Sequence, residues 1–217
     1  MKQVITAQDV PADGEFRVVR GAIVTPSARE LMAARGVRLL EVSQEEMPAA
    51  PPERVVAMGA DHGGYRLKEI LKPVLAGLGL EFSDVGVHAE TPADYPDIAL
   101  QVTELIVSGV AARGILIDGA GIGSAIAANK VPGIRAALCY DRASARNSRE
   151  HNDSNVLTLG ARLLTASQAE DVLRTWVGTP FAGGRHQARL QKIREIEQRY
   201  LKKTERDGGR PVPGVSL

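Results

Sequence analysis

The chain has one cysteine, Cys139, among its 217 residues. A single cysteine excludes an internal disulfide framework and fits a reducing compartment. Because Cys139 lies in the apolar run 136–139, we expect a buried structural thiol. The chain also lacks an apolar run of roughly 18 residues, which predicts no transmembrane helix. Its N-terminus lacks the apolar core of a secretory signal, so we expect a cytoplasmic protein.

The chain also has little excess charge of either sign. Its 27 Lys and Arg residues nearly balance 26 Asp and Glu residues, and the net charge is +1. This balance argues against a strong nucleic-acid or acidic-membrane footprint. The hydrophobic fraction of 44% is enough for a real core. The length suits one domain plus an extension.

The most informative stretch is 113–130, which predicts a buried strand, a glycine turn and a helix start. Residues 115–117 form an apolar run typical of a parallel strand covered on both faces, and Asp118 ends it. Glycines at 119, 121 and 123 allow the backbone to turn sharply and expose its N–H groups. From Ser124 the sequence has good helix propensity. A carboxylate is therefore expected at the carboxyl edge of a strand, where open α/β sheets bind ligands.

Two other interpretations of this loop remain open at this point. Glycine-rich turns are common, so the loop could be a tight connection without a ligand. A dinucleotide site is the other option, because Asp141 follows the next apolar run at about the distance of a ribose-binding acid. The spacing disfavours that option, because the third glycine of G-x-G-x-x-G would fall on Ser124.

Strand-like and helix-like stretches alternate through residues 54–206. This alternation predicts an α/β domain with a mostly parallel, doubly wound sheet. The predicted strands are 54–61, 80–87, 113–117, 134–140 and 156–159. The predicted helices are 65–78, 97–108, one from 124, 141–150, 167–177 capped by Ser167, and a long charged one from 185 to about 206.

Residues 1–44 form a small N-terminal extension of their own. Strands are expected at 16–20, 22–25 and 37–42, with a helix capped by Thr25 and ending at Gly36. The extension is too short to hold much core alone, so we expect it to dock on the main domain or on a partner. A proline-rich linker, 45–53, joins it to the main domain, and the tail 207–217 is expected to be disordered.

Three histidines lie in polar loops where chain ends can converge on a ligand: His62, His151 and His186. They lack H-x-x-x-H spacing, which argues against a zinc site. Arg185 and Arg189 lie one helical turn apart and share a face. Such a pair is usually a solvated surface, but it also suits a phosphate clamp that Arg162 could join.

Five motifs together resemble the type B ribose-5-phosphate isomerase family, which also includes isomerases of galactose and allose 6-phosphates. They lie at 59–64, 119–130, 133–136, 151–155 and 183–187, and the resemblance covers about residues 54–200. It implies a Rossmann-like three-layer α/β/α sandwich. It also implies dimers or tetramers whose active sites are shared between subunits, and no metal or organic cofactor. Separately, residues 25–31 resemble short segments of proteins associated with bacterial microcompartments, which suggests a microcompartment partner for residues 1–50.

The resemblance implies interconversion of an aldose phosphate and a ketose phosphate through an enediolate. His151 would open the sugar ring, and Asp61 and His62 would contact the sugar or its phosphate. The backbone N–H groups of 119–123, with Asn152, would stabilise the developing oxyanion. The substrate-binding residues that it implies are Asp61, His62, Gly119, Ala120, Gly121, Ile122, Gly123, Ser124, Asn152, Arg162, Arg185 and Arg189.

The chain departs from the family pattern at the catalytic base. Many members have a cysteine where this chain has Asp118, and others have a glutamate where it has Ser124. Ala120 replaces a threonine or serine. Asp118 is the natural substitute, since a carboxylate can remove a proton beside a carbonyl. A helix N-terminus would weaken this base and burial would strengthen it, and the sequence leaves the balance open.

Three hypotheses follow from the sequence. The first is a sugar-phosphate isomerase with Asp118 as base and His151 as ring opener, acting first on ribose 5-phosphate and ribulose 5-phosphate. The second is a catalytically weak relative that binds sugar phosphates or serves as an assembly component. The third is a nucleotide-binding oxidoreductase.

Overall fold

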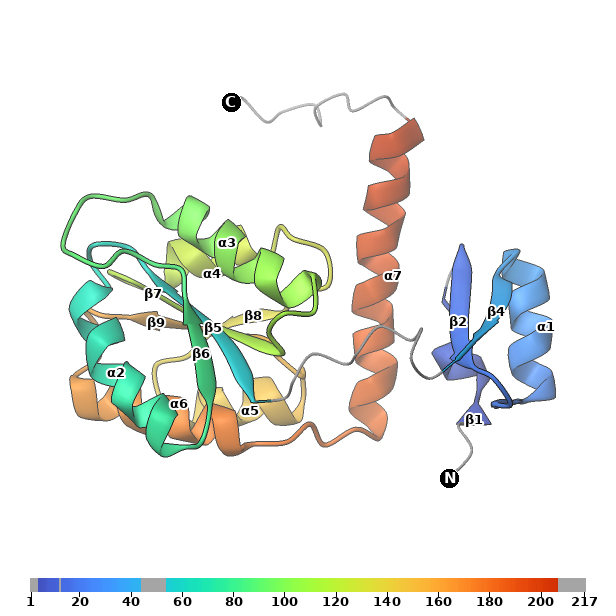
Figure 1. Cartoon of the computed structure of the whole chain (residues 1–217), viewed down its shortest axis with the longest axis horizontal. Helices are drawn as coiled ribbons and strands as arrows, with labels where there is room; N and C mark the ends of the chain where they lie inside the picture. The colour runs from blue at the N-terminus through green and yellow to red at the C-terminus, as the bar shows by residue number, and fades with distance from the viewer. Residues whose placement is uncertain (1–3, 12, 44–53, 207–217) are drawn as a thin grey trace. The chain divides into compact units, whose positions relative to one another are not determined.

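The computed structural model describes residues 4–11, 13–43 and 54–206, with side chains as far as Leu201. The chain divides into two compact units, Met1–Ala50 and Pro51–Leu217, and each is described by itself (Figure 1). The predicted linker 45–53 and the predicted disordered tail 207–217 lie outside the described residues.

The first unit is a small α/β element with parallel strand pairs. Its elements are β1 (Val4–Ile5), η1 (Ala7–Asp9), β2 (Glu15–Val19), β3 (Ile23–Val24), α1 (Pro26–Arg35) and β4 (Arg38–Val42). Strand β1 pairs with β3, and β2 with β4. The Thr25 side chain accepts the Ala28 N–H at 3.4 Å, and Gly36 ends α1 at φ 65°, which confirms both predicted helix ends. Val18, Val24 and Met32 belong to a hydrophobic cluster of this unit.

The second unit is built on five parallel strands. Their order across the sheet is β6 (Glu81–Asp84), β5 (Val55–Ala60), β7 (Arg113–Asp118), β9 (Val156–Gly160) and β8 (Ala136–Leu138). Every neighbouring pair is parallel. The predicted parallel sheet is confirmed, although the predicted strands 80–87 and 134–140 are shorter in the structure.

Helices cover both faces of this sheet, as Figure 1 shows. One face carries α2 (Tyr65–Gly77), α5 (Arg142–Glu150) and α6 (Ala166–Gly178). The other carries α3 (Tyr95–Val107) and α4 (Ile122–Ala128). The long helix α7 (Arg185–Arg206) follows α6. The three-layer α/β/α sandwich is therefore confirmed.

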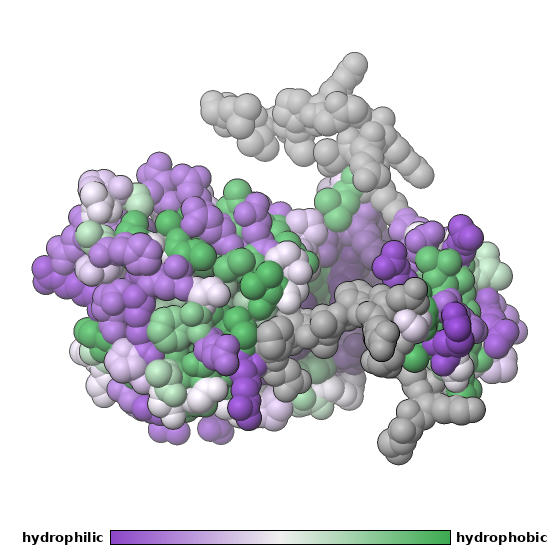
Figure 2. Space-filling model, viewed as in Figure 1, coloured by the Kyte–Doolittle hydropathy of each residue, from purple (hydrophilic) through white to green (hydrophobic). Residues whose placement is uncertain are grey.

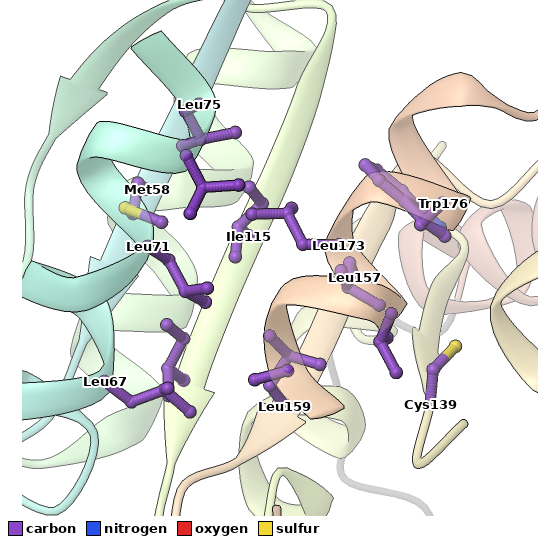
Figure 3. Packing of buried hydrophobic residues seen from close by; sticks show 14 of the residues in the cluster. Met58, Leu67, Leu71, Leu75, Ile115, Cys139, Leu157, Leu159, Leu173 and Trp176 are labelled. Atoms are coloured by element: carbon purple, nitrogen blue, oxygen red, sulfur yellow. The ribbon is translucent and has the colours of Figure 1, made fainter. Parts of the chain in front are cut away.

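The larger core lies between the sheet and the layer of α2 and α6 (Figure 3). Leu71, Ile115 and Leu173 are fully buried there, and each such side chain stabilises the fold by about 1.5–3 kcal/mol. Trp176 is also fully buried, and its indole N–H donates to Ser154 Oγ at 2.8 Å. Cys139 is buried beside them, as predicted.

Three helices begin earlier than the sequence predicts. Helix α6 is capped by Thr165, not Ser167, because Thr165 and Gln168 form a reciprocal capping box. Helix α4 begins at Ile122, two residues before Ser124, because Gly121 takes φ +77° and acts as its N-cap. Helix α3 begins at Tyr95 with a proline in its first turn.

The surface of the second unit is mixed in polarity. Figure 2 shows hydrophilic residues over much of its visible face, with hydrophobic residues between them. Helix α7 exposes a stripe of large hydrophobic side chains that includes Ile193, Ile196 and Tyr200. Among the described residues, no helix combines the length and the apolar character that crossing a membrane requires.

Candidate active site

The site lies where β5 and β7 end side by side. Asp61 directly follows β5, and Asp118 is the last residue of β7. The strands pair through Ala60 and Ile117, and the Asp61 N–H donates to the Ile117 carbonyl at 3.3 Å. From β5 the chain first adds β6 on one side and then β7 on the other. This is a topological switch point, the place at which open α/β sheets bind ligands.

A pocket of about 380 Å³ opens at this edge. It is lined by Asp61, His62, Gly63, Tyr95, Asp118, Gly119, Ala120, Gly123 and Arg162. Seven of these are residues that the sequence assigned to the site. Tyr95 and Gly63 were not assigned.

The Asp118 carboxylate is 5% exposed and is held by backbone N–H groups of its own loop. Oδ1 accepts the N–H of Ala120 at 2.8 Å and that of Gly121, and Oδ2 accepts that of Ser124 at 2.9 Å. Burial alone would raise the pKa of this carboxyl, but the hydrogen bonds from Ser124, Gly121 and Ala120 outweigh it and lower the pKa. Asp118 is therefore ionised at neutral pH.

The loop after Asp118 leaves other N–H groups free. Within the described residues, the N–H groups of Gly119, Ile122 and Gly123 have no hydrogen-bond acceptor. Gly121 must be glycine, because it has φ +77° and a Cβ there would lie 2.5 Å from Leu138 Cδ1. The free N–H groups can donate to an oxyanion in the pocket.

Aromatic and basic side chains border the pocket. A Cβ at Gly123 would lie 2.6 Å from the ring of Tyr95, so only glycine lets this ring rest against the loop. His62 Nδ1 accepts the Ala93 N–H at 3.4 Å. The Arg162 N–H donates to the Gly119 carbonyl at 3.0 Å, which fixes this arginine beside the loop.

The remaining predicted residues lie at the opposite side of the sheet, by the amino-terminal ends of its strands. The Asn152 carbonyl accepts Arg135 Nε at 3.1 Å, and Arg135 directly precedes β8. Strand β7 pairs with β9 from Gly114 to Asp118. About five residues of extended strand, or roughly 16 Å, therefore separate the amino-terminal ends of these strands from their carboxyl ends. His151 and Asn152 therefore lie too far from Asp118 of the same chain to share its pocket.

Comparison with known proteins identifies the family to which the chain belongs. Residues 56–193 match the family model described as Ribose/Galactose Isomerase. The chain belongs to this family. Its members interconvert aldose and ketose phosphates, so the chain is a sugar-phosphate isomerase of the ribose/galactose isomerase family.

Individual members of the family resemble about two thirds of this chain. The chain is 43% identical over 144 residues to ribose-5-phosphate isomerase B of Escherichia coli, covering 66% of this chain and 97% of the relative. It is 39% identical over 140 residues to D-erythrulose-4-phosphate isomerase of Pectobacterium atrosepticum, covering 64% and 91%. The structure of ribose-5-phosphate isomerase B from Clostridium thermocellum matches with a TM-score of 0.66 and 49% identity, covering 67% and 99%.

At its amino-terminal edge, this family member stacks His151 on His186. The ring centroids are 4.2 Å apart and the planes differ by 9°. The Asn147 amide nitrogen lies 2.8 Å from His151 Nδ1. Because His186 is the second residue of α7, the stack brings the exposed Arg185 and Arg189 to the same edge as His151.

The turn after His151 is held by two arginines. Asp153 has φ 44°, a left-handed conformation that is uncommon for a residue other than glycine. Its carboxylate accepts Arg149 Nη1 at 2.8 Å and Arg135 Nη2 at 2.9 Å. These ion pairs stabilise the turn that presents His151 and Asn152.

The structure thus divides the predicted site residues into two groups. Asp61, His62, Asp118, Gly119, Ala120, Gly123 and Arg162 line one pocket, and Gly121 and Ser124 hold Asp118 within it. Ile122 is the first residue of α4 in the same loop but is not among the residues that line the pocket. His151, Asn152, Arg185 and Arg189 lie at the other edge. Sequence reasoning missed Tyr95, although its position after a polar loop at a helix start was a usable signal. No group of three or more potential metal ligands occurs among the residues the structure describes.

Proposed function

We propose that the chain interconverts ribose 5-phosphate and ribulose 5-phosphate in an active site shared by two copies of the chain. The observation that carries this proposal is the separation of the two residue groups to opposite edges of the sheet. One copy supplies the pocket around Asp118, and the second supplies His151, Asn152, Arg185 and Arg189. A homodimer is the smallest assembly that meets this requirement, and a homotetramer also meets it.

Ring opening comes first in this mechanism. The C1–O ring bond breaks, the C1 hydroxyl loses its proton, and the ring oxygen gains one. His151 of the second copy hydrogen-bonds the ring oxygen and assists this transfer. Asp61 and His62 contact the sugar hydroxyl groups from the pocket.

Asp118 then removes the proton from C2 of the open aldose. The electrons move to the C1 oxygen, and the resulting enediolate is stabilised by the free N–H groups of Gly119, Ile122 and Gly123, with Asn152 of the second copy. Asp118 returns its proton to C1, and the C2 hydroxyl proton passes to the C1 oxygen, which gives the ketose. The Asp118 carboxylate lines the pocket in its ionised form, which is the form a base needs.

Arginines bind the phosphate group. Arg162 lies at the pocket rim, and Arg185 and Arg189 come from the second copy. Guanidinium groups donate paired hydrogen bonds to phosphate oxygens, which fixes the distance between the phosphate and the reacting carbons.

Turnover by the purified full chain tests this function. We expect conversion of ribose 5-phosphate to ribulose 5-phosphate, lost on Asp118→Asn substitution. D-erythrulose 4-phosphate is the second substrate to assay, because one relative bears that name. Turnover of that substrate alone would overturn the pentose assignment and retain the reaction type.

A catalytically weak sugar-phosphate-binding protein is the second candidate. Three N–H donors on Asp118 and its lowered pKa favour this candidate, because they reduce the affinity of the carboxylate for a proton. Calorimetric binding of sugar phosphates without turnover of any of them would support it over the isomerase.

The N-terminal unit is proposed to dock the enzyme to a partner, with a bacterial microcompartment component as the first choice. The unit has its own hydrophobic cluster and lies outside the family match at 56–193. Co-sedimentation of the full chain with microcompartment shells, absent after removal of residues 1–50, tests this role. Equal sedimentation of both forms would contradict it.

A further inference from the structure

Two side chains of the same copy fix the ring of His151. His186 lies parallel to it at 4.2 Å, which limits tilting of the ring. Asn147 lies one helical turn before His151 and contacts its Nδ1 at 2.8 Å, which limits rotation within the plane. A ring so restrained presents Nε2 in one direction, and no hydrogen bond to Nε2 occurs within the described part of the chain.

Which partner donates the hydrogen bond between Asn147 and His151 decides which ring nitrogen of His151 carries the proton. An amide nitrogen donates hydrogen bonds and does not accept them. Because it is Nδ2 of Asn147 that faces Nδ1, this ring atom must be the acceptor, and the proton of the neutral imidazole must be on Nε2. An imidazolium ring would carry a proton on Nδ1 as well and would oppose the amide.

The stacked His186 also favours an uncharged pair of rings. It is 7% exposed, and its Nδ1 has no hydrogen-bond partner among the described residues. Burial first, and then His151, Arg185 and Arg189, lower the pKa of His186, against a smaller opposing effect of Glu150. A positive charge on His186 is therefore disfavoured in the stack.

We propose that Asn147 and His186 are positioning residues that hold His151 as a neutral imidazole with its proton on Nε2. In this form His151 donates a hydrogen bond to the sugar oxygen and polarises it, as neutral histidines do in other isomerases. This role rests on the proposed function, in which His151 opens the ring. The protonation state itself is independent of any turnover.

Nitrogen-15 NMR of the histidine rings in the full chain tests the proposal directly. We expect an unprotonated Nδ1 and a protonated Nε2 for His151 at neutral pH. Asn147→Asp keeps the size of the side chain and reverses the contact, since a carboxylate accepts from Nδ1. This variant should move the proton of His151 from Nε2 to Nδ1.

Matched variants separate the two positioning residues. Asn147→Leu removes the hydrogen bond and should leave a mixture of both neutral tautomers. His186→Phe keeps a stacked ring and should preserve the tautomer, whereas His186→Ala should not. A protonated Nδ1 in the wild type, or no response to Asn147→Asp, would overturn the proposal.

Steady-state kinetics of Asn147→Asp distinguishes a positioning role of Asn147 from a purely structural one. In Asn147→Asp, kcat should fall with little change in KM, because Nε2 without its proton no longer donates to the sugar oxygen. An unchanged kcat together with the expected NMR change would refute the role of the Nε2 proton in turnover. If no sugar phosphate is turned over, the proposed function fails and the NMR result still decides the state of His151.

Discussion

The backbone N–H of Ser124 donates to Oδ2 of Asp118 at 2.9 Å, across the turn that connects β7 to α4. Ala120 and Gly121 donate to the other oxygen. One carboxylate thus organises the glycine loop and also lines the pocket. The carboxyl group of Asp118 is ionised in this position, and its lowered pKa makes it a weaker proton acceptor than a free carboxylate.

Replacing Asp118 by asparagine should abolish most of the turnover. The amide has nearly the same shape but cannot accept a proton from C2, and loss of a positioned base costs about 10²–10⁴-fold in kcat. The measurement is kcat with ribose 5-phosphate, together with exchange of the C2 proton with deuterated solvent. Asp141→Asn, at the exposed N-cap of α5, is the control and should keep wild-type turnover. Unchanged exchange in Asp118→Asn would refute the assignment of the base.

The ionisation of Asp118 should also appear in acid stability. Its pKa is lowered in the folded state, so its stabilising effect is full above the ordinary aspartate value of about 3.9 and is lost as pH falls through the folded value. The difference in Tm between wild type and Asp118→Asn should therefore stay constant from neutral pH to about pH 4 and shrink below it. A difference that disappears near neutral pH would contradict the lowered pKa.

Much of the pocket could be predicted because parallel strands end at one edge. Asp61 and Asp118 follow apolar runs, so their proximity needs only the parallel sheet. Placement of His151 at the amino-terminal ends of the strands follows from α5, which ends at Glu150 as predicted, because a helix that joins two parallel strands runs back to their amino-terminal ends. The role of Asn147 could not be predicted from the sequence. It is one polar residue among many on a polar helix, and only the structure shows its amide against the ring of His151.

Competition between two nearby capping residues explains the wrong start predicted for α6. Ser167 and Thr165 are both good N-caps, and the sequence offers no choice between them. The structure selects Thr165 because Gln168 completes a reciprocal pair of hydrogen bonds with it. Tyr95 was missed because its role depends on contact with Gly123, and the two are distant in sequence.

Replacing Asp84 by alanine should strongly destabilise the second unit. Lys68 is fully buried, and its Nζ donates to both Asp84 oxygens at 2.6 Å and to the Val87 carbonyl at 2.8 Å. Removal of the carboxylate leaves this buried ammonium with only the more exposed and more distant Glu69 carboxylate, at 3.5 Å, so we expect a cost of about 3–5 kcal/mol. Urea unfolding of the full chain measures this cost.

Glu69→Ala is the matched control for Asp84. Glu69 pairs with the same network, at 2.6 Å from Lys72 Nζ, but its side chain is 40% exposed. An exposed pair contributes no more than about 1 kcal/mol, so this variant should unfold at nearly the wild-type urea concentration. Equal effects of the two variants would contradict the importance of burial.

Removing residues 1–50 should leave the isomerase reaction intact. The family match begins at residue 56, and relatives that lack this unit are covered almost completely, to 97% for the Escherichia coli relative. The two hydrophobic clusters of the second unit are made of described residues between Val55 and Val177. We expect kcat and KM within about twofold of the full chain, since surface changes remote from a site alter little. A large loss of kcat would instead place the N-terminal unit in the active assembly.

Mixing two inactive variants tests the shared site. Asp118→Asn and His151→Ala should each be inactive alone, because every site lacks one group. In a mixed dimer one site combines intact Asp118 from one copy with intact His151 from the other. Random reassembly after mild denaturation should therefore restore about a quarter of the wild-type activity.

The control pairs Asp118→Asn with Asp61→Ala. Both residues line the same pocket in one copy, so every site of a mixed dimer carries one of the two defects. No activity should return in this mixture, although the subunits exchange equally well. Recovery in both mixtures, or in neither, would contradict an active site built from opposite edges of two sheets. Recovery only with His151→Ala follows from strand geometry, because roughly 16 Å of β-sheet separates Asp118 from His151 within one copy.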